Sequence, residues 1–308
     1  MNKEIRWPCS SLPPLEPRLQ RRYQQLVQEH LQLSQVVAAG LNALPGTASS
    51  FASTQAAWRF YQNESVSLPA LAQPLLEQGR RSVESACQEY ALIVHDWSLL
   101  NYNGHASKAD RIGSKINRAE GYELQTALLI DDRDGQPLAP LVQNLACARG
   151  LYSSRTTEVA KVPTHLDELL VRLDYLAGLS LDRPLVHIID REGDSVGHYR
   201  QWRDHTFLVR AKGRQRVQWE GQSWMLDSVA KQLHQQLMFC RSVDFQGKPA
   251  RQYVAETAVG LSRPTRQKRR GKKPSSVAVA PIALRLIVSE VRAEDGRILS
   301  EWLLLSNA

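Results

Sequence analysis

The sequence has few cysteines and no long hydrophobic run, and both shortages narrow the possible classes of protein. Four of the 308 residues are cysteine, and no two of them stand in a C-x-x-C spacing. Neither a zinc ribbon nor a redox motif is therefore indicated, and free thiols are favoured over a disulfide framework. No stretch reaches the roughly 18 consecutive apolar residues of a membrane-spanning helix. The N-terminal residues contain no apolar signal-peptide core, so we expect a cytoplasmic protein.

Two motifs of nucleotide-binding proteins are also missing. The chain contains no G-x-G-x-x-G fingerprint and no P-loop. Nucleotide binding therefore has no support from motifs. No histidine–cysteine cluster has the spacing of a metal site. Carboxylates remain the candidate carriers of chemistry.

Positive charge is concentrated in one segment. The net charge is +8, and "RPTRQKRRGKK" at 263–273 carries seven basic residues and no acidic one, so the rest of the chain is nearly neutral. The basic residues are Arg263, Arg266, Lys268, Arg269, Arg270, Lys272 and Lys273. Such a run suits contacts with nucleic-acid phosphates. A solvated basic loop tip is an equally good interpretation of the run taken alone.

The order of the elements predicts the fold class. Apolar spacings of three and four predict helices over about 18–44, 53–64 and 68–89. Short apolar runs then predict strands at 91–96, 121–130 and 136–146, followed by a helix at 163–179 and a strand at 184–190. This order lets the last strand lie parallel to the first. We therefore predict an α/β protein with a ribonuclease-H-like core and a small helical N-terminal domain.

Two aspartates end the first and last of these strands. Asp96 closes "ALIVHD", and Asp190 closes "PLVHIID". The carboxyl ends of parallel strands are where α/β sheets bind ligands, and neighbouring strands lie about 4.8 Å apart. Two carboxylates at matching heights could share the metals of a two-metal phosphoryl-transfer site. Acidic residues also end strands simply because the chain surfaces there, and the pattern alone leaves both interpretations open.

Other polar residues near these strands have structural interpretations. The three acids of "DDRDG" at 131–135 are predicted to form a hairpin turn, because Asp and Gly tolerate the backbone angles of turns. His95 points to the opposite face of its strand from Asp96, so we expect it to pack or to form a structural hydrogen bond. From 213 to about 281 the pattern predicts short strands and turns, and a final hairpin covers 283–307.

Four blocks of the sequence resemble the DDE transposases of the insertion-sequence-four family, in particular the group of the Tn-five transposase. They span about 51–308 and read "AAWRFYQNESVSLPAL", "LIVHDWSLLNY", "VHIIDREGDSVGHY" followed by "FLVRAK", and "WLLLSN". The third block is the most specific. The resemblance implies a helical DNA-binding domain at 1–89, a catalytic core at 90–212, a β-rich insertion with the basic loop at 213–290, and a return to the core at 291–308.

The resemblance also implies a function and its residues. Asp96 and Asp190 would be the first two members of an Asp-Asp-Glu triad that binds Mg²⁺ or Mn²⁺, with Arg191 and Glu192 in support. Trp302 matches a position that stacks on a DNA base in this group. The implied activity is cut-and-paste DNA transposition, with strand nicking and transfer by two-metal catalysis. The partners would be double-stranded transposon-end and target DNA, with no membrane, in the bacterial cytosol near the nucleoid.

One departure from the family pattern affects this expectation. The family's glutamate lies on a helix after the "WLLLS" strand, and this sequence ends at Ala308, before such a helix. Glu290 and Glu301 belong to the final hairpin and are poor substitutes. We therefore expect a truncated, inactive chain that lacks the dimerising C-terminal helices. Two alternatives remain at this point: a non-catalytic DNA-binding remnant or inhibitor of a transposase, and, more weakly, a metal-dependent phosphatase that pairs Asp190 with Asp194.

Overall fold

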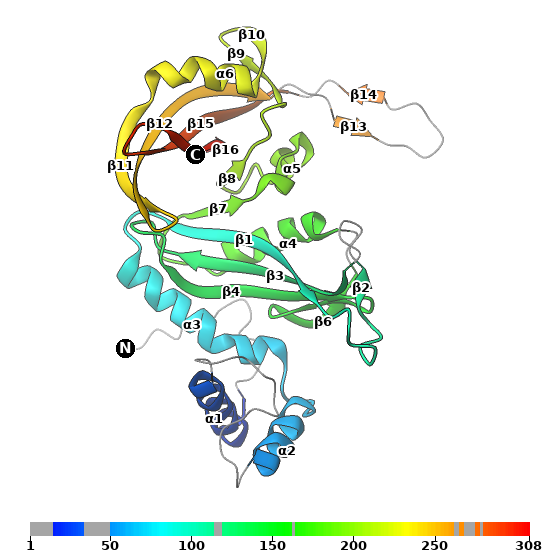
Figure 1. Ribbon diagram of the computed structural model, residues 1–308. Helices are drawn as coiled ribbons and strands as arrows, with labels where there is room; N and C mark the ends of the chain where they lie inside the picture. The colour runs from blue at the N-terminus through cyan, green and yellow to red at the C-terminus, as the bar shows by residue number, and fades with distance from the viewer. Residues whose placement is uncertain are drawn as a thin grey trace, which may run out of the picture. The chain divides into compact units, whose positions relative to one another are not determined.

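The protein is described by a computed structural model that covers 15–33, 50–113, 119–161, 164–261, 265–267, 275–277 and 280–308. The chain divides into two compact units. Unit 1 comprises Met1–Gln78, Leu99–Leu124 and Leu141–Lys161. Unit 2 comprises Gly79–Ser98, Gln125–Pro140 and Val162–Ala308. Helix α3 (Leu68–Ala86) and strands β1 (Ala91–Asn101), β3 (Glu120–Ile130) and β4 (Pro137–Cys147) contribute residues to both (Figure 1).

Unit 1 contains a small helical core. Helix α1 (Pro17–Leu33) packs on α2 (Ser50–Tyr61) through the buried side chains of Leu26 and Phe60. The ring of Tyr23 stacks on Phe60, and its hydroxyl donates a hydrogen bond to the carbonyl of Leu71 at 3.0 Å. The three N-terminal helices predicted from the sequence are present. The predicted continuation of the first helix, from 34 to 44, lies outside the described residues.

Unit 1 also contains short antiparallel strands. They are β2 (Ile112–Gly113), β5 (Gly150–Ser153) and β6 (Thr156–Ala160). Strand β5 pairs with β4 and with β6. The sequence did not predict β5 and β6, because they are short and lack a clear apolar alternation. Gly121, the second residue of β3, lies opposite β1. An added Cβ there would lie 1.8 Å from the carbonyl oxygen of Leu100, so this close approach requires glycine.

Unit 2 is a mixed α/β structure built on a large, mostly antiparallel sheet. Neighbouring strands in this sheet follow the order β10-β9-β12-β15-β16-β8-β7, and β1 lies next to β7. They are β7 (Leu185–Ile189), β8 (Phe207–Arg210), β9 (Arg216–Trp219), β10 (Gln222–Met225), β11 (Met238–Phe245), β12 (Lys248–Leu261), β15 (Ile282–Ala293) and β16 (Ile298–Ser306). Strand β11 pairs with β12 only. The pairs β1–β7 and β7–β8 are parallel, as the predicted strand order requires for the first of them.

Short helices cover the sheet of unit 2. They are α4 (His165–Gly178), η2 (Arg191–Gly193), α5 (Val196–Gln201), α6 (Leu226–Leu233) and η3 (His234–Gln236). Figure 1 labels α4, α5 and α6. The side chain of Thr164 caps α4 by accepting a hydrogen bond from the backbone N–H of Asp167. The core between helices and sheet includes Leu173, Trp202, Phe207 and Leu305, all with no exposed surface. No helix in the described part of the chain is long and apolar enough to cross a membrane.

The acidic turn behaves as the sequence predicts. The carboxylate of Asp131 accepts hydrogen bonds from the backbone N–H groups of 133 to 136 and closes the β3–β4 turn. Asp132 accepts from the backbone N–H groups of Gln88, Glu89 and Tyr90. Burial acts to raise the pKa of Asp132, but these three hydrogen bonds lower it to about 2. Both carboxylates therefore stabilise the backbone by accepting its N–H groups.

Candidate active site at the ends of parallel strands

Asp96 and Asp190 occupy matching positions on neighbouring parallel strands. The register of β1 and β7 pairs His95 with Ile189, the last residue of β7, so Asp190 directly follows β7 and Asp96 is the next residue of β1. The strand end predicted at Asp96 is wrong, because β1 continues to Asn101. Strand alternation turns His95 and Ile189 into the core, where both are buried, and leaves Asp96 and Asp190 exposed. Neighbouring strands lie about 4.8 Å apart, a spacing over which two carboxylates can share ligands. The register thus gives matching positions on neighbouring strands to the two residues singled out from the sequence.

A basic residue extends this row to a third strand. The register of β7 and β8 pairs Ile189 with Val209, so Arg210 takes the position next to Asp190. Its Nη1 lies 3.7 Å from Oδ1 of Asp190 in an ion pair. We call Asp96, Asp190 and Arg210 the strand-end row. Arg210 was not predicted, although "FLVR" has the same form as the two other runs: an apolar strand that ends in one charged residue.

Trp302 lies beside the strand-end row. The Arg210 guanidinium lies 5.1 Å from the centroid of the Trp302 ring, within the range of a cation–π contact. Trp302 is 48% exposed, which is high for a large aromatic side chain. Strand β16 holds it there, because β16 pairs with β8 and sets Leu304 opposite Arg210. The exposed indole is thereby fixed next to Asp190 through Arg210.

Neighbouring side chains orient the carboxylates of this end of the sheet. The hydroxyl of Ser98 donates a hydrogen bond to Oδ2 of Asp96 at 2.7 Å. Glu192, on η2, is paired with Nε2 of His165 at 2.9 Å, and the His165 ring lies 4.9 Å from the ring of Trp97. Glu192 is therefore tied to the start of α4. Arg191 is exposed on the same turn. The roles in metal support predicted for Arg191 and Glu192 stay predictions.

Asp194 stabilises the structure of the loop. It is 4% exposed, and its Oδ1 accepts hydrogen bonds from the Tyr199 hydroxyl at 2.7 Å and from Gln215 at 2.8 Å. Its Oδ2 accepts from the backbone N–H of Lys212 at 2.6 Å. A buried carboxylate with both oxygens bound by protein donors is not open to a metal ion. This geometry speaks against the phosphatase interpretation, which needs Asp194 beside Asp190.

Two buried histidines lie behind the strand-end row. Nε2 of His95 and Nδ1 of His187 share a hydrogen bond of 3.0 Å across the β1–β7 pair. Burial, helped by the neighbouring His187 and Arg172, holds the pKa of His95 well below its usual value. Burial and the neighbouring His205 lower the pKa of His187 to about 3. The structural hydrogen bond predicted for His95 is confirmed.

No third ligand joins the two aspartates within the described ranges. The one group of three or more potential metal ligands found among these residues is His234, Glu290 and Glu301. It includes neither Asp96 nor Asp190. Two hard carboxylate donors in an exposed position fit Mg²⁺, which retains several of its waters when bound.

The basic run is only partly covered by the structure. Strands β13 (Thr265–Gln267) and β14 (Ser275–Val277) form a separate two-stranded ribbon, and Arg266 lies on the first of them (Figure 1). The other six basic residues, Arg263, Lys268, Arg269, Arg270, Lys272 and Lys273, lie outside the described residues. Their contact with DNA stays a prediction.

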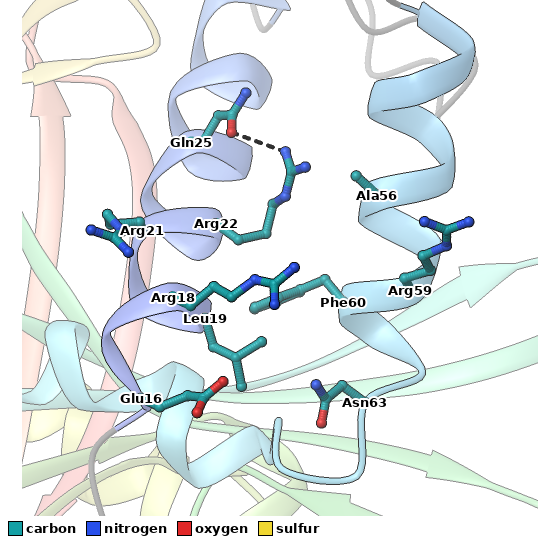
Figure 2. A pocket seen from close by; sticks show the side chains of 10 residues that line it. All are labelled: Glu16, Arg18, Leu19, Arg21, Arg22, Gln25, Ala56, Arg59, Phe60 and Asn63. Atoms are coloured by element: carbon teal, nitrogen blue, oxygen red, sulfur yellow. Dashed lines mark hydrogen bonds between the residues drawn. The ribbon is translucent and has the colours of Figure 1, made fainter.

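Unit 1 carries a second basic feature, an arginine-rich pocket. The pocket has a volume of about 530 Å³ and lies between α1 and α2, with Arg18, Arg21, Arg22 and Arg59 in its lining. Figure 2 shows Arg18 and Arg22 reaching from α1 toward α2, while Arg21 points away from α2. Arg22 donates a hydrogen bond to Gln25 at 2.9 Å. Glu16 is the one acidic residue of the lining. The excess of guanidinium groups suits an anionic ligand.

Comparison with known proteins gives remote structural similarity only. No family model matches the chain, and no curated protein matches it. Among solved structures, the chain is similar to piggyBac transposase in the cryo-EM structure of its synaptic complex with hairpin DNA, at a TM-score of 0.36 and 11% identity. The match covers 100% of this chain and 55% of that chain, so this chain spans about half the length of the other. A similarity of this size establishes neither a shared fold nor a shared activity.

Proposed function

We propose that this chain is the DNA-binding and metal-binding part of a DDE transposase of the insertion-sequence-four type. Asp96 and Asp190 would hold Mg²⁺ or Mn²⁺ for phosphoryl transfer on DNA. The observation that carries the proposal is the parallel register of β1 and β7, which gives two exposed aspartates matching positions. Asp190 directly follows β7, and Asp96 lies within β1 where its pairing with β7 ends. The sequence blocks around both aspartates resemble the same family.

The strand order supports a ribonuclease-H-like core. Strands β4, β3, β1, β7 and β8 follow one another in the sheet, and α4 connects the antiparallel strands to the parallel pair β1–β7. The predicted fold is built in this way. In open sheets that contain parallel strands, ligands bind beyond the carboxyl ends of those strands. Asp190 directly follows β7, and Arg210 is the last residue of β8.

The residues around the aspartates suggest separate roles in binding the metal ion and the DNA. A divalent ion held by Asp96 and Asp190 would supply Lewis-acid stabilisation of the reacting phosphate. Ser98 orients the Asp96 carboxylate through its 2.7 Å hydrogen bond. Arg210 presents a guanidinium beside Asp190, where it could pair with a DNA phosphate. Trp302 offers an exposed aromatic face, and stacking of a base on such a face is worth about 1–3 kcal/mol.

Binding of double-stranded DNA would use the two basic features. The arginine-rich pocket of unit 1 supplies guanidinium groups from α1 and α2, and the run at 263–273 supplies seven further positive charges. Contacts of this kind bind the phosphate backbone independently of sequence. We propose transposon-end and target DNA as the partners, in the bacterial cytosol. Dimer formation by this chain is not part of the proposal.

Catalysis by the chain alone is a separate matter. Among the described residues no third carboxylate joins Asp96 and Asp190, and two carboxylates do not fix two metals around a scissile phosphate. Misplacement by about 1 Å can cost roughly a hundredfold in rate. This observation favours a second candidate function, a non-catalytic DNA-binding chain that competes with an active transposase for the same DNA ends.

A metal titration tests the proposed site. Mn²⁺ is titrated into the purified full chain by calorimetry, and the Asp96→Asn and Asp190→Asn variants are compared with it. We expect each variant to weaken Mn²⁺ binding about tenfold or more, because each removes one of two charged ligands. Asp204→Asn is the matched control, since Asp204 is 83% exposed and pairs only with Arg203 in the described part of the chain. Equal binding by all variants would remove the metal site from the proposal.

A cleavage assay separates the two candidate functions. The chain is incubated with DNA that carries the ends of its own element, in Mg²⁺ or Mn²⁺. For the two-ligand site we expect DNA binding without specific 3′-end nicking. Nicking that Asp190→Ala abolishes would mean that the site is complete and that the chain is itself the enzyme. Absence of any DNA binding would contradict both candidates.

A further inference from the structure

A cluster of one histidine and two glutamates lies in unit 2, away from the strand-end row. His234 begins η3, directly after α6, whereas Glu290 and Glu301 lie on β15 and β16. Each residue offers a ligand atom, and these atoms lie within 4.8 Å of one another. Side chains alternate along β16, so Glu301 and Trp302 point to opposite faces of the sheet. The cluster is therefore distinct from the site proposed for catalysis.

The two glutamates face each other across a strand pair. The antiparallel register of β15 and β16 sets Glu290 directly opposite Glu301. Like charges in directly opposite positions destabilise a sheet unless a positive charge compensates them. Two side chains contribute to the compensation. The Nε of Arg292 pairs with Oε1 of Glu290, and Nε2 of His234 pairs with Oε2 of Glu301 at 2.6 Å.

This compensation leaves one oxygen without a partner. The Glu290 side chain is 1% exposed, and its Oε2 is buried with no hydrogen-bond partner in the described part of the chain. A buried acceptor left without a partner costs about 1–3 kcal/mol, and more when the group is charged. Neither Arg292 nor His234 satisfies this oxygen. The orphaned atom belongs to the same three-residue group and indicates a cation that would bind to all three side chains.

We propose that His234, Glu290 and Glu301 bind a divalent transition-metal ion of the zinc class. One imidazole nitrogen with two carboxylate oxygens is a donor set that Zn²⁺ accepts, whereas Mg²⁺ prefers oxygen ligands throughout. Bonds of about 2.0–2.1 Å in a tetrahedron put ligand atoms about 3.3 Å apart. The present spacing, 2.6 Å for His234–Glu301 and under 4.8 Å for every pair, needs only small side-chain movements to reach it.

The exposure of the ligands leaves an entry path and an open position. His234 and Glu301 are 35% and 36% exposed, so an ion can reach them from solvent, and Glu290 closes the site from the core side. Three protein ligands leave the fourth tetrahedral position for water or another ligand. The ion would join η3 to the β15–β16 hairpin.

Zinc binding by the full chain tests the proposal. The protein carries Asp96→Asn and Asp190→Asn, so that the strand-end row does not contribute, and it is stripped with a chelator and titrated with ZnCl₂ by calorimetry. We expect one Zn²⁺ per chain. In this background His234→Ala and Glu301→Gln should each weaken binding at least tenfold, since loss of an outer-shell partner alone costs 10- to 100-fold. Both side chains are partly exposed, so these variants should fold, and circular dichroism verifies it.

A matched control and a spectroscopic measurement sharpen the test. His105→Ala removes an exposed histidine from unit 1 and should leave the zinc titration unchanged. Co²⁺, used in place of Zn²⁺, should give the strong visible absorption of a tetrahedral site in the background protein and lose it in His234→Ala. The proposal is wrong if the background protein binds no zinc. It is equally wrong if His234→Ala and Glu301→Gln bind zinc as the background protein does, because the cluster would then be an ion-pair network only.

Discussion

Nη1 of Arg210 lies 3.7 Å from Oδ1 of Asp190, across the parallel pair β7–β8. The pairing of Ile189 with Val209 fixes this relationship, because it sets the two charged residues at the same height of neighbouring strands. Arg210 therefore neutralises part of the charge that a metal ion would bind. It also presents its remaining N–H groups to any phosphate that approaches Asp190. Metal and DNA binding should thus respond in opposite directions to its removal.

Substitution of Arg210 tests whether metal affinity and DNA affinity change in opposite directions. Two unit charges about 4 Å apart interact by about 1 kcal/mol in a highly exposed setting, and Asp190 is 60% exposed. We therefore expect Arg210→Gln to strengthen Mn²⁺ binding by up to about fivefold and to weaken DNA binding. Calorimetry and fluorescence anisotropy measure the two effects. Arg285→Gln is the control, because Arg285 forms an exposed ion pair with Glu256 elsewhere in unit 2. A parallel loss of both affinities would mean that Arg210 supports the fold of the site.

We expect the arginine-rich pocket of unit 1 to contribute a salt-dependent part of the affinity for DNA. Arg18 and Arg59 line the pocket from different helices. Removal of one arginine–phosphate ion pair should lower the slope of log K against log salt by about 0.9. The double variant Arg18→Gln/Arg59→Gln removes up to two such ion pairs and should bind all DNA sequences more weakly. Arg203→Gln, which removes a side chain 76% exposed in unit 2, should keep the slope. An unchanged slope in the double variant would exclude phosphate binding by the pocket.

The basic run at 263–273 makes a parallel prediction. Replacing Lys268, Arg269 and Arg270 by glutamine removes three of the seven charges of the run. If all three bind phosphate, the slope should fall by about 0.9 for each, and specific and non-specific DNA should be affected alike. A salt titration with two unrelated duplexes measures both. A loss of affinity confined to one duplex would indicate base recognition, and unchanged affinity for both would indicate a solvated loop.

The two strands next to the aspartates could be predicted from the sequence, because each contains a short apolar run. The end of β1 was predicted wrongly, since the strand continues past Asp96 to Asn101. The pairing of β1 with β7 followed from the intervening hairpin and helix. Residues such as Thr164, which caps α4, and Asp131, which closes a turn, act through local hydrogen bonds. Local chemistry of this kind can be recognised in a sequence, and the turn predicted at 131–135 is confirmed.

Features that depend on long-range register could not be predicted. Strand β12 is 14 residues long, and α6 interrupts a stretch expected to hold only short strands and turns. The apolar residues of α6 do recur at helical spacing, but eight residues are too few for a firm assignment. The facing of Glu290 and Glu301 depends on how β15 pairs with β16, and His234 comes from a distant part of the chain. No spacing along the sequence indicates that cluster.

The buried histidine pair makes the stability of the protein depend on pH. The pKa of His187 is lowered to about 3 in the folded chain, and that of His95 lies well below its usual value. An unfolded histidine has a pKa of about 6.5 and binds a proton readily below that pH. Acid therefore favours the unfolded state. The contribution of each histidine is fully present above about pH 6.5, and it is lost as the pH falls toward the folded-state value.

The slope of the free energy of unfolding against pH, taken between pH 6.5 and 5, measures this effect. Each histidine should lower the free energy of unfolding by at most about 1.4 kcal/mol per pH unit in this window. Carboxylates change little there, because the unfolded values of Asp and Glu lie near 4. Guanidinium denaturation of the full chain at several pH values gives the slope, and His95→Gln/His187→Gln should flatten it even if that variant is less stable overall. His105→Gln, at an exposed position, should keep the wild-type slope. An equally steep slope in the double variant would mean that other groups carry the acid sensitivity.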